Sequence, residues 1–142
     1  MFRDIIVSKT EEYFDYFVNV RRNLHQIPEI AFSENKTSEY IKRELKNLGI
    51  DYKEVINTGV VCVISGKGSG KTIGIRADMD GLPVTEATGL AYQSQNSGLM
   101  HACGHDMHMA ALLGAAKILN EMRDSFAGNV KLIFQPAEEG AG

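Results

Sequence analysis

The chain has 142 residues, a formal net charge of −3, and a composition that is 44% hydrophobic and 23% charged. These values are ordinary for a globular domain with a real core, and the mildly acidic balance without a basic run argues against nucleic-acid binding. No stretch approaches the roughly 20 apolar residues of a membrane span. The N-terminus lacks the apolar core of a signal peptide, and two separated cysteines do not make a disulfide framework. We therefore expect a cytosolic protein that binds neither nucleic acid nor membrane.

Two helices are predicted before any strand. Apolar residues recur at helical spacing over residues 4–24 and would form one buried stripe. A second helix is predicted from Ser33, as its N-cap, to Leu48, with Glu34 placed favourably in the first turn. Gly49 follows, where a glycine commonly ends a helix.

The apolar period then changes to that of strands. Short apolar runs predict strands at residues 55–56, 60–64, 72–77 and 130–134. Residues 81–100 predict a long polar loop, a feature that is often functional. Residues 106–122 predict the clearest helix, with Asp106 as a candidate cap. Strands that alternate with helices predict an α/β layered fold.

Metal-ligand side chains concentrate in one segment, HACGHDMH at residues 101–108. Thiolate and neutral imidazole are usual ligands of a catalytic transition metal. Cys103 and His105 lie two residues apart, so they can converge on one ion only in a turn, which Gly104 permits. Alternatively, the following helix begins earlier, and the three histidines of the segment share one of its faces.

Two other interpretations of this segment stay open. Its side chains could belong to a solvated loop, although three histidines and a cysteine within eight residues make that interpretation the weaker one. Cys103 could instead be a reactive thiol near a helix N-terminus, with a neighbouring histidine as its base. The segment therefore favours a metal site without excluding a cysteine-dependent hydrolase.

Two adjacent carboxylates, Glu138 and Glu139, follow the last predicted strand. In open α/β sheets the ligand site lies beyond the carboxyl ends of the strands, and neighbours in an extended chain point in opposite directions. One glutamate could therefore bind a metal while the other acts as general base toward a water. Asp78 and Asp80, at the end of another strand, could orient a ligand histidine, or could simply form a turn with Gly81.

Four motifs in this order resemble the aminoacylase/carboxypeptidase family of metallohydrolases. They are RRNLHQIPE at residues 21–29, RADMDGLP at 76–83, HACGHDMH at 101–108 and QPAEEG at 135–140. The closer match is the amidohydrolase branch, which includes hippurate hydrolases, N-acyl-amino-acid amidohydrolases and auxin-conjugate hydrolases. The resemblance implies a layered α/β catalytic domain of the zinc-peptidase type, with a mixed central sheet flanked by helices.

The resemblance also implies a site for two divalent metal ions, for which zinc, manganese, cobalt and nickel all come into question. Cys103, His105 and Glu139 match metal ligands of the family, and Glu138 matches its general base. Asp78 matches the aspartate that supports the site from behind.

Other motif positions carry weaker assignments. The peptidase branches have a ligand histidine where this chain has Arg76, so that ligand is absent here, as in the amidohydrolase branch. His101 and His108 match motif positions that are not assigned ligands. Together with Asp80 and Arg76, they are candidates for contacts to the substrate or to the ligand side chains.

The resemblance covers only the first part of the family's catalytic domain. Members of this branch continue well beyond it, with further ligand histidines and a lid domain that often mediates dimerisation. We therefore expect residues 1–142 to be the N-terminal part of the catalytic domain, ending in the middle of a loop at residues 140–142. The last predicted strand would then lack its usual neighbours and expose apolar surface.

The predicted activity of the full-length protein is hydrolysis of the amide bond in an N-acyl amino acid or a similar small conjugate. That parent protein is expected to act on small molecules and to form homodimers, whereas the 142-residue chain alone is expected to be inactive. The alternatives are a non-catalytic metal-binding fragment and, less favoured, a cysteine-dependent hydrolase.

Overall fold

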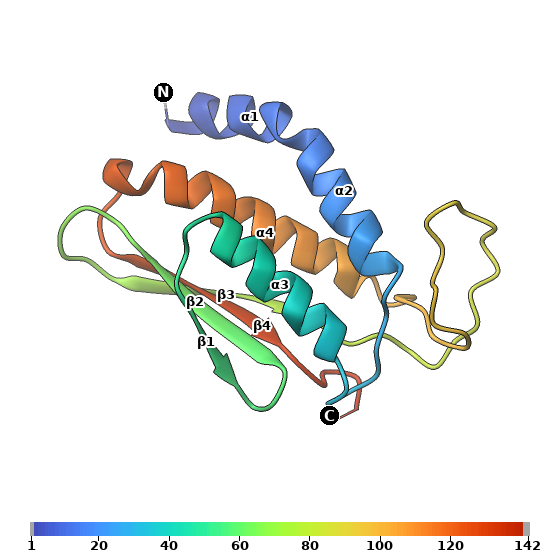
Figure 1. Ribbon diagram of the computed structural model, residues 1–142. Helices are drawn as coiled ribbons and strands as arrows, with labels where there is room; N and C mark the ends of the chain where they lie inside the picture. The colour runs from blue at the N-terminus through green and yellow to red at the C-terminus, as the bar shows by residue number, and fades with distance from the viewer. Residues whose placement is uncertain (1, 141–142) are drawn as a thin grey trace.

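The computed structural model describes residues 2–140, which form a four-stranded mixed sheet with helices packed on one face (Figure 1). The elements in chain order are α1 (Phe2–Glu12), α2 (Phe14–His25), α3 (Asn35–Asn47), β1 (Tyr52–Val55), β2 (Gly59–Ser65), β3 (Thr72–Asp78), α4 (His105–Glu121), the short 3-10 helix η1 (Arg123–Ser125) and β4 (Asn129–Gln135). The predicted α/β fold with a mixed sheet and flanking helices is confirmed. The sequence was expected to end in the middle of a loop at residues 140–142. Of these residues, Ala141 and Gly142 lie outside the described part of the chain.

The core lies between the sheet and the helices. Alternate residues of β2 and β4 point into it, because side chains of a strand alternate between its two faces. The buried apolar side chains of these strands are Val60, Cys62, Ile64, Val130, Leu132 and Phe134. Those of the covering helices include Val20, Leu24, Ile41, Leu45, Met109, Leu112, Leu113 and Ala116. On the other face of the sheet, Val63 is 49% exposed, so the helices cover one face only among residues 2–140.

The last strand is not at an edge of the sheet, whereas β3 is. The prediction that the last strand lacks neighbours is wrong, because β4 pairs antiparallel with β2 and parallel with β3. The strand order is β1-β2-β4-β3, so the crossover through α4 returns the chain to the middle of the sheet. On β3, Ile73 is 63% and Ile75 38% exposed. Exposed apolar side chains therefore lie on the edge strand β3 as well as on β2.

The first predicted helix is divided in two. α1 ends at Glu12 and α2 begins at Phe14, with the intervening Tyr13 outside the helical conformation. The Tyr13 hydroxyl donates to the carboxylate of Glu121 on α4 at 2.9 Å. The break thus lies where the N-terminal helices contact α4. Apolar periodicity did not detect it, because a single non-helical residue leaves the spacing of the stripe almost unchanged.

The start of α3 also differs from the prediction. Its N-cap position is held by Glu34 rather than Ser33, and the Glu34 side chain makes no cap hydrogen bond. The Glu29 carboxylate instead accepts the backbone N–H groups of Lys36 and Thr37 at 3.1 and 2.9 Å. A carboxylate seven residues upstream reaches the helix start only through the folded chain, so local spacing could not reveal it.

Two segments between the elements complete the fold. β1 precedes its predicted position, and Ile56 and Asn57 form the β1–β2 turn with φ of 46° and 62°. Residues 81–100 form a loop as predicted, with one isolated bridge between Leu82 and Met100. Among residues 2–140, no helix is long and apolar enough to cross a bilayer.

Because Leu113 is fully buried on α4, we expect Leu113→Ala to lower the free energy of unfolding by about 2–5 kcal/mol. Met107 lies on the same helix and is 56% exposed, so Met107→Ala should change that free energy by no more than about 0.5 kcal/mol. Urea unfolding followed by circular dichroism measures both. Similar losses in the two variants would contradict the packing of α4 described above.

Candidate metal centre

Three side chains predicted as metal ligands converge at one end of the sheet. Cys103, His105 and Glu139 each offer one ligand atom, and these atoms lie within 4.8 Å of one another. We call these residues the ligand triad. His105 is the first residue of α4, Cys103 lies in the turn before it, and Glu139 comes from the chain beyond β4. A thiol, an imidazole and a carboxylate together fit a borderline divalent metal such as zinc.

Gly104 makes the first two ligands converge. Gly104 holds the N-cap position of α4. Its backbone φ of +90° is one that residues other than glycine rarely adopt. The predicted turn between Cys103 and His105 is therefore confirmed. The alternative, with the three histidines on one helical face, is wrong, because α4 begins at His105 and leaves His101 outside the helix.

The ring of His105 is held in one tautomer by the chain. Its Nδ1 lies 2.8 Å from the backbone oxygen of Asp80, which can only accept, so Nδ1 carries the hydrogen. The neutral ring then presents its lone pair at Nε2, as a metal ligand must. The fully buried Asp80 carboxylate lies 3.4 Å from the same Nδ1 and strengthens this orientation. His105 itself is buried, so its ring has little room to turn.

The Cys103 thiol is half-buried, with its sulfur 3.7 Å from the same backbone oxygen of Asp80. Burial raises the pKa of this thiol above its usual value. A reactive cysteine needs the opposite shift, so the pKa disfavours the cysteine-dependent hydrolase. A divalent ion would instead displace the proton and bind the thiolate.

The two glutamates lie in a turn and not in an extended chain. Ala137 has a φ of +58°, which costs an alanine about 1–2 kcal/mol, and residues 138–140 form the turn that follows. We call residues 137–140 the glutamate turn. The expectation that neighbours point in opposite directions therefore does not apply here. Glu138 Oε2 lies 3.8 Å from Nε2 of His105, and Glu139 joins the ligand triad, so both carboxylates serve one site.

Asp80 makes the supporting contacts that the resemblance implied for Asp78. The Asp80 side chain is fully buried, and its carboxylate accepts the backbone N–H groups of Glu138 at 3.2 Å and Glu139 at 2.8 Å. Asp78 is instead held by Arg76, whose Nε lies 3.0 Å from Oδ1 and whose Nη2 donates to Oδ2 at 3.3 Å. The two aspartates thus have different partners, and Asp80 is more than a turn residue.

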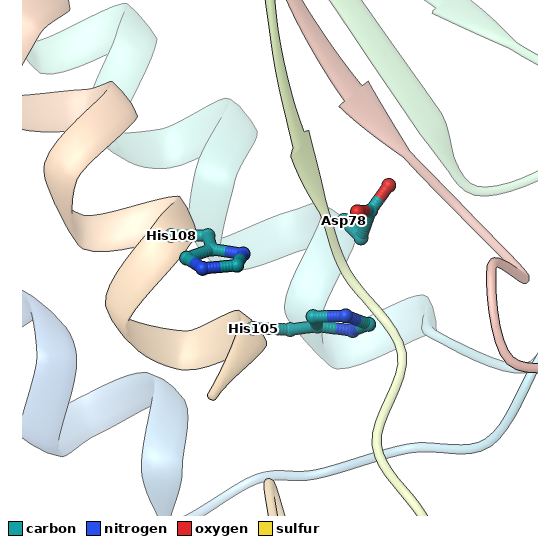
Figure 2. Close-up of side chains that lie close together, drawn as sticks. All are labelled: Asp78, His105 and His108. Carbon is teal, nitrogen blue, oxygen red and sulfur yellow. The ribbon is translucent and has the colours of Figure 1, made fainter. Parts of the chain in front are cut away.

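A second group of potential ligands shares His105. Asp78, His105 and His108 also offer atoms within 4.8 Å of one another, and Figure 2 shows both rings projecting from α4 toward the end of β3. Since only Nε2 of His105 has a free lone pair, the two groups cannot each hold an ion through that ring. The Arg76 guanidinium already neutralises Asp78. These contacts favour the ligand triad.

His101 is buried beside the site, and both of its ring nitrogens lack a hydrogen-bond partner within residues 2–140. Burial lowers the pKa of this imidazole to about 4, so the ring is neutral at pH 7. His101 is therefore close to Cys103 and His105 in the sequence, but its ring makes no hydrogen bond to a residue of the ligand triad.

A buried polar network that the sequence did not indicate lies at the start of α4. Asp106 was a candidate cap, but its carboxylate lies 2.7 Å from Nδ1 of His25 and 2.8 Å from Nε of Arg21. His25 Nε2 lies 3.2 Å from Glu86, which comes from the long loop. The network thus fastens α2 and the long loop to the helix turn that carries His105. His25 lies inside the motif at residues 21–29 that carries the family resemblance. Its place in that motif was the signal in the sequence that could have indicated the network.

Comparison with known proteins assigns these motifs to a family. Residues 74–142 match the model of peptidase family M20/M25/M40. The N-acetyl-L-cysteine deacetylase of Bacillus subtilis (strain 168) is 51% identical over 127 residues, which cover 88% of this chain and 30% of that protein. IAA-amino acid hydrolase ILR1-like 5 of Arabidopsis thaliana is 45% identical over 135 residues, which cover 94% of this chain and 31% of that protein.

A solved structure agrees with the fold. The Bacillus subtilis YXEP protein, described as a dinuclear metal binding peptidase from the M20 family, matches with a TM-score of 0.88 and 44% identity, over 91% of this chain and 37% of that chain. The match of residues 74–142 to peptidase family M20 and this structural similarity confirm the resemblance of the motifs. The chain spans about a third of the length of the relatives it matches.

The contacts of the two aspartates lead to opposite expectations for their removal. Asp80→Ala should lower the free energy of unfolding by about 1–3 kcal/mol, because it leaves two backbone N–H groups without their acceptor. Asp78→Ala should lower it by about 1 kcal/mol or less, because its partner Arg76 is 57% exposed and easily solvated. Urea unfolding of the two variants measures the difference, and an equal or reversed order would contradict the assignment of Asp80.

Proposed function

We propose that the chain forms part of the active site of a metal-dependent amidohydrolase that cleaves the amide bond of N-acyl amino acids or similar small conjugates. The observation that carries the proposal is the convergence of the ligand triad from separate segments, with the Glu138 carboxylate 3.8 Å from Nε2 of His105. The names of the relatives, a deacetylase of N-acetyl-L-cysteine and a hydrolase of IAA-amino acids, support a substrate of this class.

The residues present fit a metal centre, because the ligand triad combines a thiol, a fixed imidazole tautomer and a carboxylate. Bound divalent ions would polarise the amide carbonyl and lower the pKa of a water. Cys103, His105 and Glu139 would hold such ions. Glu138, whose side chain is 41% exposed, would take a proton from the water and deliver it to the nitrogen of the leaving amine.

The number and kind of ions are part of the proposal. The description of the Bacillus subtilis structure as dinuclear supports two divalent ions per full-length subunit. The thiolate of Cys103 favours zinc or another borderline metal over magnesium or calcium, and manganese, cobalt and nickel stay candidates. The homodimer and the cytosolic location of the longer protein stay predictions.

A second candidate function rests on the same triad. Three ligands from one chain are enough to hold an ion, so the chain could bind metal without completing a catalytic site. The two candidates agree on metal binding and differ only in turnover.

Metal content after dialysis tests both candidates. We expect the unsubstituted chain to retain zinc, and Cys103→Ser to lose most of it because a hydroxyl is a far weaker ligand than a thiolate. Cys62 is buried in the core away from the triad, so Cys62→Ala should keep the metal. Elemental analysis provides the measurement. Equal zinc content in Cys103→Ser and Cys62→Ala would exclude Cys103 as a ligand.

Turnover distinguishes the base from the ligands. In a longer form of the protein that carries this segment, we expect Glu138→Gln to retain metal while its kcat falls by roughly 10²–10⁴-fold. Glu139→Gln should lose metal as well as turnover, because Glu139 belongs to the ligand triad. Hydrolysis of an N-acetyl amino acid, measured alongside metal content, separates the two effects. Retained turnover in Glu138→Gln would remove Glu138 from the role of base.

A further inference from the structure

A fully buried glutamate lies behind the glutamate turn. Glu34 is 0% exposed, although it stands at the N-cap position of α3 where a charged side chain usually reaches solvent. Its Oε1 accepts the backbone N–H of Ala137 at 2.8 Å, and its Oε2 accepts the hydroxyl of Thr58 at 2.7 Å. The Glu34 side chain therefore links the β1–β2 turn to the glutamate turn.

Glu34 and Asp80 together hold three successive backbone N–H groups. Ala137 donates to Glu34, and the next two residues, Glu138 and Glu139, donate to Asp80. Hydrogen bonds from backbone N–H groups to carboxylates are stronger than those between neutral groups. Ala137 has a φ of +58°, so the turn departs from the conformation that alanine prefers and needs such contacts to persist.

The β1–β2 turn supports the same place through packing. Thr58 is 3% exposed, and its neighbour Gly59 lies so close to the chain before the glutamate turn that an added Cβ would stand 3.0 Å from Cδ of Pro136. The β1–β2 turn therefore lies against Pro136. Glu34 is therefore fixed from one side by Thr58 and fixes Ala137 on the other.

We propose that Glu34 is a positioning residue for the metal centre. Acting through the backbone of Ala137, it sets where Glu139 stands as a ligand and where Glu138 stands as the base. The inference rests on the proposed function, since it assigns Glu34 an effect on metal binding beyond its effect on the fold. Glu34 belongs neither to the ligand triad nor to the groups assigned to proton transfer, so it is not a catalytic residue.

The test compares Glu34 with Glu29, a glutamate next to the same helix. Glu29 accepts N–H groups at the start of α3, and none of its side-chain hydrogen bonds within residues 2–140 reaches the glutamate turn. Glu29→Ala therefore reproduces the loss of a carboxylate at the start of α3 without touching residues 137–139. In Glu34→Gln, the amide oxygen can still accept from Ala137 while the amide nitrogen donates to the oxygen of Thr58.

Two measurements report on the 142-residue chain. Hydrogen exchange of the backbone amides of residues 137–139 reports the turn, and titration with Co²⁺ in competition with a chelator reports the ligands. We expect Glu34→Ala to speed that exchange and to weaken Co²⁺ binding by roughly 10–100-fold relative to Glu29→Ala, the range typical for groups that orient a ligand. Glu34→Gln should restore both values to near those of the unsubstituted chain.

The outcomes separate the positioning role from a general effect on stability. Exchange that rises equally throughout the chain in Glu34→Ala and Glu29→Ala, with equal Co²⁺ affinity, would overturn the proposal. Should Glu34→Ala not fold, Thr58→Val removes only the hydroxyl that fixes Oε2, and it must speed exchange at residues 137–139 selectively or the proposal fails. Absence of Co²⁺ binding by the unsubstituted chain would count against the proposed function, while the exchange rates would still decide whether Glu34 holds the turn.

Discussion

The backbone oxygen and the carboxylate of Asp80 join the three segments that build the site. The oxygen accepts the Nδ1 hydrogen of His105 at 2.8 Å, and the carboxylate accepts two backbone N–H groups of the glutamate turn. The end of β3, the start of α4 and the chain beyond β4 are thereby tied at one residue. The carboxylate is fully buried, and each of its oxygens has a donor, so solvent does not compete for these contacts.

The sheet topology explains why these segments meet. β3 and β4 are adjacent and parallel, with Asp78 opposite Gln135, so their carboxyl ends lie at the same edge. α4 forms the crossover between them, and its N-terminus returns to that edge (Figure 1). Unpaired N–H groups and the helix dipole make such an N-terminus favourable for carboxylates. Glu138 and Glu139 are thus brought to a place that already attracts negative charge.

The sequence predicted the parts of this site that depend on local spacing. The sequence predicted Cys103 and His105 as ligands and a turn at Gly104. This was possible because two ligands that lie two residues apart can converge only in a turn, and a glycine between them permits that turn. The sequence also placed Asp80 among the residues that could orient a ligand histidine. It could not predict the contacts of Asp80 and Glu34 to the glutamate turn, because these hydrogen bonds join residues more than 55 positions apart. A glutamate at a helix start is typical of a solvated first-turn residue, and only the folded chain buries it. Strand order likewise depends on the crossover, which periodicity does not encode.

Charge explains why a bound ion would stabilise this arrangement. Asp78 is neutralised by Arg76 and Asp80 by backbone donors, but the Glu139 side chain has no cation partner within residues 2–140 apart from the His105 ring of the triad. The neighbouring Glu138 carries a second carboxylate, and like charges held at one site repel each other. A divalent ion would reverse the sign of that interaction, so the same geometry that crowds acceptors together favours metal binding.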